Sequence, residues 1–326
     1  RGEPMRLMLL GENLIAFRDN PGKLGVMDHR CPPRLASLFY GRNEEGGMRC
    51  IYHGWKFDTD GNCIEQANVP AHQDFKANVK VTAYKVHERN GIVWVYMGRR
   101  EVAPPMPEVE VTLIPGTEVN VQFVQRNCNW MQALEGDIDT SHYGFLHAGS
   151  IKAEDVREDN LLKYQIANRA PEYIISEEDF GVMYSAYRGT DEGETYWRFA
   201  QFAFPFWTQV PQGAFQSRVS ARAWVPMDDT HTMSVSWRWA KTAEKRVAPL
   251  KSGKQIPGSE PVLEYLPNTT DWYGRWRPVA RQENDYLIDR EAQESYLIYS
   301  GISVIRIQDQ SVTESMCAIS DHTLEH

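Results

Sequence analysis

The chain has 326 residues, more than one hydrophobic core usually organises, so its length favours two domains. With 42% hydrophobic and 24% charged residues, its composition is that of a globular protein and excludes a disordered one. Its 35 basic and 44 acidic side chains give a net charge of -9, which makes nucleic acid an improbable partner. No apolar run approaches the roughly 20 residues of a membrane helix, and the start lacks the shape of a signal peptide. We therefore expect a cytoplasmic protein without a membrane partner.

The first part of the chain, residues 8–98, consists of short apolar runs separated by turn residues, which predicts a small all-β unit. The segment 102–108 is rich in proline, and each proline fixes its own φ and restricts the residue before it. We expect an extended linker there, with one domain over residues 1–102 and a second over residues 103–326.

The second part of the chain predicts an α+β domain. A helix-like run covers residues 130–147, and a last helical segment is expected over about 278–293. Between them, alternating strands joined by a turn at 226–229 predict an antiparallel sheet. The residues expected to share one face are Ser217, Val219, Ala221 and Ala223 on the first of these strands and Met233, Val235, Trp237 and Trp239 on the second.

The five cysteines are an odd and sparse set, unsuited to a disulfide scaffold, so Cys31 and Cys50 need a chemical explanation. Each stands on a turn of the all-β unit, and Cys50 begins a Cys-x-x-His pattern that ends at His53. Two thiolates and an imidazole suit a metal site, and Gly54 permits the close backbone approach that such loops need. The competing interpretation is two buried cysteines beside a surface histidine.

Over nearly its whole length the chain resembles the Rieske non-haem iron ring-hydroxylating oxygenases, and especially their phthalate dioxygenase-like oxygenase components. The segments that carry the closer resemblance are Leu35-Ala36-Ser37-Leu38, Gly41-Arg42-Asn43-Glu44-Glu45-Gly46-Gly47 and Tyr52-His53-Gly54-Trp55-Lys56-Phe57. The resemblance implies an all-β Rieske domain, then a catalytic domain whose antiparallel sheet is covered by helices, of the helix-grip type. It also implies that Cys31, Cys50 and His53 hold a Rieske-type [2Fe-2S] cluster, in which two cysteines bind one iron and two histidines the other.

The fourth cluster ligand of this family is missing, because its position is Pro33, whose side chain has no lone pair for a metal. His29 is the nearest spare imidazole, but it lies on the other side of Cys31 from the family's position. The cluster is therefore expected to be impaired unless another ligand completes it. One alternative stays open, a non-catalytic aromatic-ligand-binding or zinc-bearing relative that has lost the cluster. Its zinc site would consist of His29, Cys31, Cys50 and His53.

A second constellation lies in the helix-like run, where His142 and His147 stand five residues apart. On a regular α-helix the two side chains differ in direction by ~140°, so they can share a metal only through a broken or widened turn, which Gly144 permits. Taken alone, the segment favours two histidines that cap or hydrogen-bond on a surface helix. The resemblance implies instead that both bind a mononuclear iron. Its carboxylate ligand is expected from the later helix at Asp285, with Asp289 one turn further as the second choice.

Asp139 has a separate role by the same resemblance. In the homotrimers of this family, an aspartate bridges the mononuclear-iron histidine of one subunit to a Rieske histidine of its neighbour; here these are His142 and His53. A carboxylate that accepts from both imidazole N–H groups fixes their tautomers. We therefore expect a head-to-tail homotrimer, with Asp139 as the electron bridge between subunits.

Arginines on the alternating strands, together with aromatic neighbours, could form a pocket that clamps a carboxylate. They are Arg188, Arg198, Arg218, Arg222 and Arg238, among Tyr196, Phe202, Phe204 and Trp224. The resemblance implies an O2-dependent dioxygenase or monooxygenase that hydroxylates or O-demethylates an aromatic, carboxylated substrate. No nucleotide-binding fingerprint accompanies the pair Gly46-Gly47, so a separate reductase is expected to deliver electrons from NAD(P)H.

Overall fold

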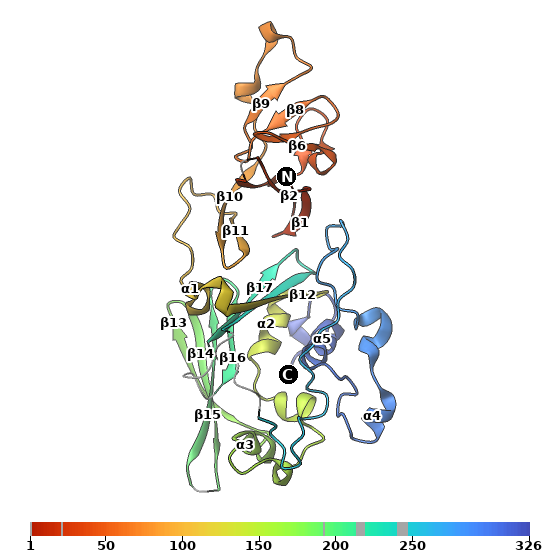
Figure 1. The fold of residues 1–326 in the computed structure, drawn as a ribbon. Helices are drawn as coiled ribbons and strands as arrows, with labels where there is room; N and C mark the ends of the chain where they lie inside the picture. Colours follow the sequence, from red (N-terminus) through yellow and green to blue (C-terminus); the bar gives the residue numbers. More distant parts are fainter. Residues whose placement is uncertain (1, 21, 192, 213–218, 240–246) are drawn as a thin grey trace. The chain divides into compact units, whose positions relative to one another are not determined.

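The computed structural model describes the chain except residues 1, 21, 192, 213–218 and 240–246. The described residues form two compact units, which we describe separately (Figure 1). Unit 1 comprises Arg1–Glu108 and Asn268–Arg275, and unit 2 comprises Val109–Pro267 and Trp276–His326. The first change of unit, after Glu108, falls at the end of the proline-rich segment in which we expected the linker.

The segment Asn268–Arg275 packs with unit 1, although the residues before and after it in the sequence belong to unit 2. The ring of Trp272 lies 5.0 Å from that of His29 in an edge-to-face arrangement. The guanidinium of Arg6 lies 5.6 Å from the centre of the Trp272 ring and donates to Thr270 O at 3.1 Å. These aromatic and cation–π contacts join residues far apart in the chain, which local patterns cannot reveal.

Unit 1 is built of β-strands with short 3₁₀ turns. Its larger sheet has the antiparallel order β1-β2-β3-β10-β11; a second sheet has the order β6-β7-β8-β9, and β4 pairs with β5. The strand bounds are β1 Met5–Leu9, β2 Glu12–Arg18, β3 Leu24–Asp28, β4 Arg30–Cys31, β5 Ala36–Ser37, β6 Arg42–Glu44, β7 Gly47–Arg49, β8 Trp55–Phe57, β9 Cys63–Gln66, β10 Ala83–Arg89 and β11 Ile92–Tyr96. The 3₁₀ turns are η1 Leu38–Tyr40, η2 Ala71–Gln73 and η3 Lys76–Asn78.

Strand β2 supplies apolar side chains to both cores of unit 1. Ile15 and Phe17 point into one core, and Leu14 and Ala16 into the other, as the two-residue period of a strand requires. The first core also holds Met27, Cys31, Leu38, Met48, Cys50, Trp55, Phe57, Cys63 and Val81. The two cysteines expected to bind a metal are thus anchored in the packed interior of this unit.

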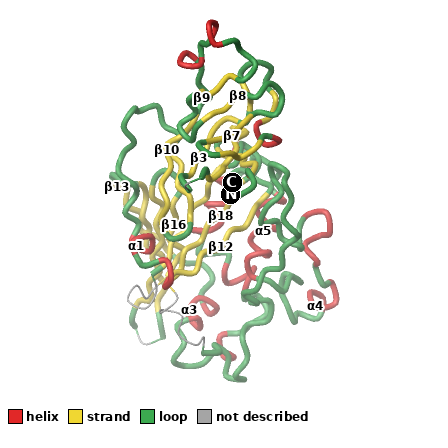
Figure 2. Tube along the Cα trace, turned by 45° about the horizontal axis from the view of Figure 1, so that its top comes forward, coloured by secondary structure: helices red, strands yellow, loops and turns green. Residues whose placement is uncertain are grey.

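Unit 2 contains one antiparallel sheet of seven strands in the order β12-β18-β17-β16-β15-β14-β13 (Figures 1 and 2). The strand bounds are β12 Val119–Arg126, β13 Glu172–Glu178, β14 Gly181–Gly189, β15 Thr195–Ala203, β16 Trp207–Gln212, β17 Ser220–Pro226 and β18 Thr232–Trp239. The expected pairing across the turn at 226–229 is confirmed, since Ala221 faces Trp237 and Ala223 faces Val235. Ser217, which was placed on the same face, lies outside the described residues.

Helices cover this sheet, as the predicted α+β fold requires. Helix α2 contacts β15 to β18, and α5 contacts α2. Trp224 from β17 is fully buried in a cluster with Cys128, Ala133 and Leu134, which fixes α2 on the sheet. The helix bounds are α1 Glu110–Leu113, α2 Trp130–Ile138, α3 Leu162–Ala167, α4 Arg290–Glu294 and α5 Ile305–Ser315, with single turns η4 Gly116–Glu118, η5 Tyr143–His147, η6 Ala153–Asp155, η8 Gln282–Leu287 and η9 His322–Leu324.

The last helical segment, expected over 278–293, is not one helix. The backbone at Asp285, Tyr286 and Leu287 has φ of 49°, 54° and 54°, a left-handed conformation that interrupts a right-handed helix. Only the turn η8 and the short helix α4 form there. The longer helix of this region, α5, follows later in the chain and was not predicted.

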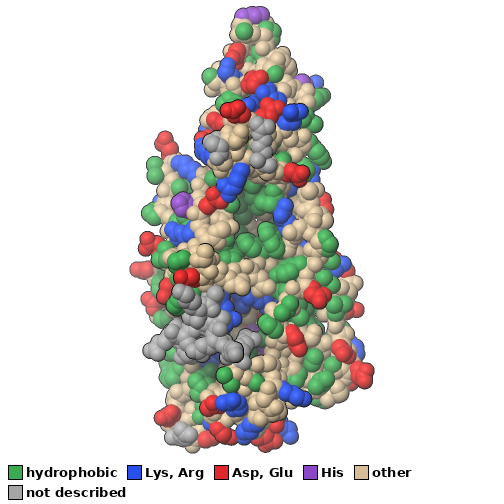
Figure 3. Space-filling view, viewed as in Figure 1, with side chains coloured by type: hydrophobic (Ala, Val, Ile, Leu, Met, Phe, Trp, Pro, Cys, Tyr) green, Lys and Arg blue, Asp and Glu red, His purple; other side chains and the backbone are tan. Residues whose placement is uncertain are grey.

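None of the helices in the described residues is long and apolar enough to cross a bilayer. On the face drawn in Figure 3, acidic and basic side chains are interspersed among apolar ones. This mixture agrees with the moderate acidic excess of the composition and offers a polyanion no broad basic surface on that face.

Candidate functional site

Helix α2 stops at Asp139, just before the pair of histidines. Asp139 has an extended backbone, and its carboxylate accepts from the Ser141 amide at 2.6 Å and the Ser141 hydroxyl at 2.7 Å. A side chain that takes a nearby amide in this way competes with helical hydrogen bonding. The chain therefore leaves the helix and begins a separate turn at His142.

The turn η5, Tyr143–His147, is a π-turn, in agreement with the widened turn that two histidines five residues apart require to face one metal. The Ala148 amide donates to Tyr143 O, five residues back, at 3.1 Å. Gly144 is buried in this turn, and a Cβ there would lie 2.9 Å from Arg169 Cγ. Glycine thus allows close packing of the turn and is not needed for an unusual φ.

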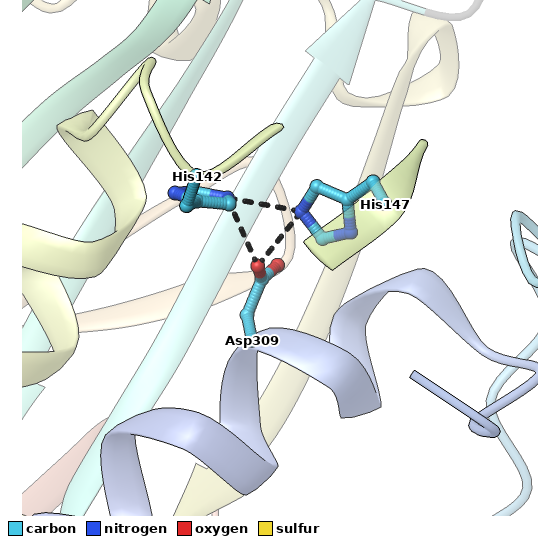
Figure 4. A group of neighbouring side chains, drawn as sticks. All are labelled: His142, His147 and Asp309. Atoms are coloured by element: carbon cyan, nitrogen blue, oxygen red, sulfur yellow. Dashed lines mark hydrogen bonds and ion pairs between the residues drawn. The ribbon is translucent and has the colours of Figure 1, made fainter. Parts of the chain in front are cut away.

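The two imidazoles converge on a carboxylate from α5 (Figure 4). His142 Nε2 and His147 Nε2 are 3.0 Å apart, and Asp309 Oδ1 lies 3.4 Å and 3.0 Å from them, respectively. Ligand atoms ~2.1 Å from one metal and at angles of ~90–110° lie ~3.0–3.4 Å from each other. Among the described residues, this is the one group of three or more potential ligands within 4.8 Å of one another.

The outward nitrogens of both imidazoles are fixed by acceptors. His142 Nδ1 lies 3.3 Å from Asp139 Oδ2, and His147 Nδ1 lies 2.6 Å from Gln308 Oε1. The orientation of the Gln308 amide is determined, because its Nε2 donates to Gly258 O at 2.8 Å and to Ile302 O at 2.6 Å. These acceptors favour the proton at each Nδ1, which leaves each Nε2 as the nitrogen that can bind a metal beside Asp309.

Two lone pairs and a carboxylate oxygen facing one another need a cation between them. Burial would lower the pKa of His142, but its contacts with Asp139 and Asp309 raise it to about 9, so a proton takes this place when no metal does. Burial would raise the pKa of Asp309, but hydrogen bonds from His142 and His147 hold it well below its usual range. The donor set fits a divalent ion such as Fe(II), which two histidines and one carboxylate bind with coordination positions left open.

Asp285 and Asp289, the carboxylates expected from the sequence, do not complete this group. Asp285 is exposed in the left-handed turn of η8. Asp289 caps α4 by accepting from the Ala292 amide at 2.9 Å. Asp309, and not the expected Asp285, faces the two histidines, because the segment around Asp285 is not helical and does not present its carboxylate to them.

A cavity of about 770 Å³ adjoins this group, since Asp309 is among the residues that line it. Its size lies in the range of about 300–1,000 Å³ typical of small-molecule sites. The apolar part of its lining includes Phe123, Val210, Trp237, Val262, Leu263, Trp276 and Ile305, and its cationic part consists of Arg222, Arg238 and Arg306. A flat, apolar molecule with an anionic substituent matches such a lining.

The arginines expected to form a carboxylate clamp lie in different parts of the structure. Arg222 and Arg238 line the cavity, as expected. Arg188 donates to Asn168 O at 2.7 Å, and Arg198 bonds to Gln165 and Pro211, so both hold other segments together. Arg218 lies outside the described residues. The cavity lining does not include Tyr196, Phe202, Phe204 or Trp224, whereas Arg306, which was not predicted, belongs to it.

The two cysteine loops of unit 1 share one hydrogen-bonding pattern. The Leu35 amide donates to Cys31 O at 2.8 Å, and the Gly54 amide donates to Cys50 O at 3.0 Å. Both donors have a positive φ, 59° at Leu35 and 76° at Gly54. A Cβ at Gly54 would also lie 2.9 Å from Ala67 Cβ, so the close approach expected there is present. The loops are thus matched turns, each of which begins at a buried cysteine.

These loops present three of the four donors that a Rieske cluster uses. The Cys31 and Cys50 thiols are buried side by side, and burial together with their mutual hydrogen bond raises the pKa of Cys31. His53 is half-buried on the second loop, but Pro33 is exposed on the first and offers no donor. His29 Nδ1 lies 3.0 Å from Ser37 Oγ, and its ring packs on Trp272. The residues present therefore do not fit a complete four-ligand cluster.

We expect Gln308→Leu to weaken Fe(II) binding at the group of His142, His147 and Asp309 by about 10- to 100-fold, the usual contribution of a group that orients a metal-bound histidine. The measurement is anaerobic Fe(II) titration, with ¹⁵N NMR of the His147 ring as a second readout of the lost Nδ1 hydrogen bond. Gln310→Leu is the matched control. Gln310 is also buried on α5, and it bonds to Glu314 at 2.8 Å. Q310L should lower stability without a change in Fe(II) affinity; equal affinity losses in the two variants would contradict the role of Gln308.

Comparisons with known proteins agree with this two-unit organisation. Residues 1–85 match the Rieske [2Fe-2S] domain, and residues 95–326 match the family described as LigXa C-terminal domain like. The fold is similar to that of dicamba monooxygenase bound to 3,6-dichlorosalicylic acid, with a TM-score of 0.57 over 99% of this chain and 88% of that one. At 16% sequence identity, this likeness supports the fold alone.

Two relatives match along almost the whole chain. The 3-chlorobenzoate-3,4-dioxygenase oxygenase subunit of Comamonas testosteroni is 51% identical over 99% of this chain and 75% of its own length. The phthalate 4,5-dioxygenase oxygenase subunit of Pseudomonas putida is 33% identical over 99% of this chain and 73% of its own length. These relatives support a Rieske cluster and a mononuclear iron, and they do not favour a non-catalytic alternative. The chain belongs to the Rieske non-haem iron oxygenases, as the oxygenase subunit of an aromatic dioxygenase or monooxygenase.

Proposed function

We propose that this oxygenase subunit hydroxylates, or removes an O-methyl group from, an aromatic carboxylate bound in the cavity beside Asp309. One observation carries the proposal: Asp309 both meets the two histidines and lines a cavity of about 770 Å³ with apolar and cationic walls. The names of the relatives at 51% and 33% identity, a 3-chlorobenzoate and a phthalate dioxygenase, both denote aromatic carboxylates. A 28% identical relative is named an O-demethylase, which keeps demethylation within the proposal.

His142, His147 and Asp309 would hold the mononuclear iron. When bound there, Fe(II) has free coordination positions at which O2 can be activated. The protein's own contribution is to fix the ligands: Asp139 and Gln308 keep the Nδ1 protons in place, so that both Nε2 atoms stay available. The apolar cavity walls would then hold an aromatic ring next to Asp309 and exclude water from its faces.

We also propose a homotrimer in which Asp139 links His142 of one subunit to His53 of the next, with electrons supplied from NAD(P)H by a separate reductase. Asp139 supports this, because its side chain is 40% exposed although one of its oxygens lies 3.3 Å from His142 Nδ1. Burial would raise the pKa of Asp139, but bonds from His142 and Ser141 lower it to about 2, so it stays an acceptor. A native mass of one subunit would contradict the trimer. Location in the cytoplasm stays a prediction from the sequence.

The test is single-turnover oxidation of 3-chlorobenzoate under ¹⁸O2 by dithionite-reduced protein. Because Pro33 removes a cluster ligand, both this chain and its Pro33→His variant are used. We expect ¹⁸O in the ring of the product with P33H, and little product with the chain as it stands. Absence of ¹⁸O-labelled ring product from this acid, together with absence of phenol and formaldehyde from O-methylated benzoates, both with fully metal-loaded P33H, would contradict the proposed function.

A further inference from the structure

The lining of the cavity includes three arginines but one carboxylate, that of Asp309. Of its three arginines, Arg222 is already paired, because it forms an ion pair with Asp137 of α2. Asp137 is buried and also accepts from Thr208 Oγ1 at 2.6 Å and from Trp224 Nε1 at 3.3 Å. Three donors occupy the oxygens of Asp137, so this carboxylate neutralises Arg222 and no other arginine of the cavity. The Arg222–Asp137 pair joins α2 to the sheet.

Among the residues that the structure describes, no carboxylate pairs with Arg306 in this way. Arg306 is half-buried on α5, and among the described residues its only hydrogen bond is to Ser236 Oγ at 3.2 Å, a neutral acceptor. Burial and the nearby Arg222 lower the pKa of Arg306 to about 9, because both disfavour the cation. A buried guanidinium normally has a carboxylate as its counterion, and a planar fork of donors suits two carboxylate oxygens.

The position of Arg306 relates this missing counterion to the metal centre. Arg306 precedes Asp309 by three residues on α5, so the two side chains lie on the same side of the helix. Both line the cavity, together with the apolar residues Val210, Leu263 and Ile305. An aromatic molecule between these walls can therefore place an acid group on Arg306 while its ring lies next to Asp309.

We propose that Arg306 binds the carboxylate of the substrate and sets the preference of the cavity for anionic aromatic rings. This inference rests on the proposed function and adds to it the residue that recognises the negative charge of the substrate. Arg238 is the other arginine of the lining without a carboxylate partner among the described residues, but it is two residues beyond Ser236 on β18, about 7 Å further along the same face of the strand. Arg306 is thus the cation placed next to the metal ligand.

The test compares the binding of 3-chlorobenzoate and its uncharged counterpart 3-chlorobenzamide by isothermal titration calorimetry. The proteins are the chain itself, Arg306→Gln, Arg306→Lys, Arg238→Gln and the control Arg157→Gln, which removes an arginine from an exposed ion pair with Asp159. We expect R306Q to weaken benzoate binding about 10- to 100-fold and to leave benzamide binding within about threefold. R157Q should match the unchanged chain with both ligands. R306K keeps the charge but loses the planar fork, so a smaller loss is expected, again for the benzoate alone.

The outcomes separate this inference from the proposed function. If the unchanged chain binds benzoate no better than benzamide, the carboxylate substrate itself is wrong. If it prefers benzoate but R306Q keeps that preference, or R238Q loses it instead, then Arg306 is not the carboxylate site and the proposed function stands. Equal loss of both ligands in R306Q would also overturn the inference. Thermal unfolding checks the fold of each variant. If R306Q does not fold, R306K decides: an R306K protein that loses no affinity for the benzoate, or loses equal affinity for the benzoate and the benzamide, overturns the inference.

Discussion

Replacing Pro33 by histidine is expected to raise the [2Fe-2S] content of the protein from near zero to roughly one cluster per chain. The reason is that Cys31, Cys50 and His53 provide three donors, and the iron without thiolates has one protein ligand where it needs two. Iron and acid-labile sulfide analysis, with the visible and EPR spectra of the reduced protein, measures this change. Product formation should rise by at least about tenfold with the cluster, since electrons then reach the catalytic domain.

Pro33→Ala is the matched control, because it removes the proline ring without adding a lone pair. P33A should remain as poor in cluster as the unchanged chain, and both should still bind Fe(II) at His142, His147 and Asp309 in unit 2. A full Rieske spectrum from the unchanged chain would show that His29 or an external ligand completes the cluster. Restoration by P33A would show that the proline ring, and not the missing donor, is the defect.

Replacing Asp309 by asparagine is expected to lower the affinity of the catalytic domain for Fe(II) by more than about 100-fold. Groups that merely hydrogen-bond to a ligand contribute roughly 10- to 100-fold, so a direct ligand should contribute more. The neutral amide also removes the charge that His142 and His147 face at 3.4 Å and 3.0 Å. Anaerobic Fe(II) titration measures the affinity, and oxidation of 3-chlorobenzoate by the corresponding P33H/D309N protein should be undetectable.

Asp285→Asn and Asp289→Asn provide the controls for this change. Asp285 is exposed, and Asp289 caps α4 by a bond that asparagine can also accept, so both variants should bind Fe(II) as the unchanged chain does. Loss of Fe(II) affinity in D285N, with retention in D309N, would return the carboxylate ligand to the position expected from the sequence.

His142 and His147 could be predicted as a pair of metal ligands only from the resemblance to a known family, because the segment alone favoured histidines on a surface helix. Two histidines five residues apart can share a metal only across a widened turn, and the π-turn at Tyr143–His147 has that form. The hairpin of β17 and β18, in contrast, could be predicted from the sequence pattern itself, since alternating apolar residues and a turn specify its register. The missing donor at Pro33 was recognised because the resemblance marks that position as a ligand and the proline side chain has no lone pair.

The carboxylate that faces the histidines, Asp309, could not be predicted, because the sequence of α5 lacks the pattern by which a helix is recognised. Its buried face carries Gln308, Gln310, Thr313 and Glu314 beside the single apolar Ile307, so no apolar stripe marks it in the sequence. Hydrogen bonds stabilise this face instead, such as that from Gln132 Nε2 to Thr313 O at 2.9 Å. The segment near Asp285 had the more helix-like pattern, but its left-handed backbone became evident only from the structure.

Because Arg306 and Asp309 lie on one helix, the distance between the carboxylate-binding group and the metal ligand is fixed, and a substrate must match it. Three residues of α-helix rise by about 4.5 Å along the axis, and a tilt or slide of α5 carries both groups together without altering this interval. The facing walls, from β12, β17, β18 and residues 261–265, belong to other segments and can be remodelled independently. Divergence within this group of enzymes should therefore change the width and depth of the rings accepted, while the span from the acid group to the oxidised position is inherited unchanged.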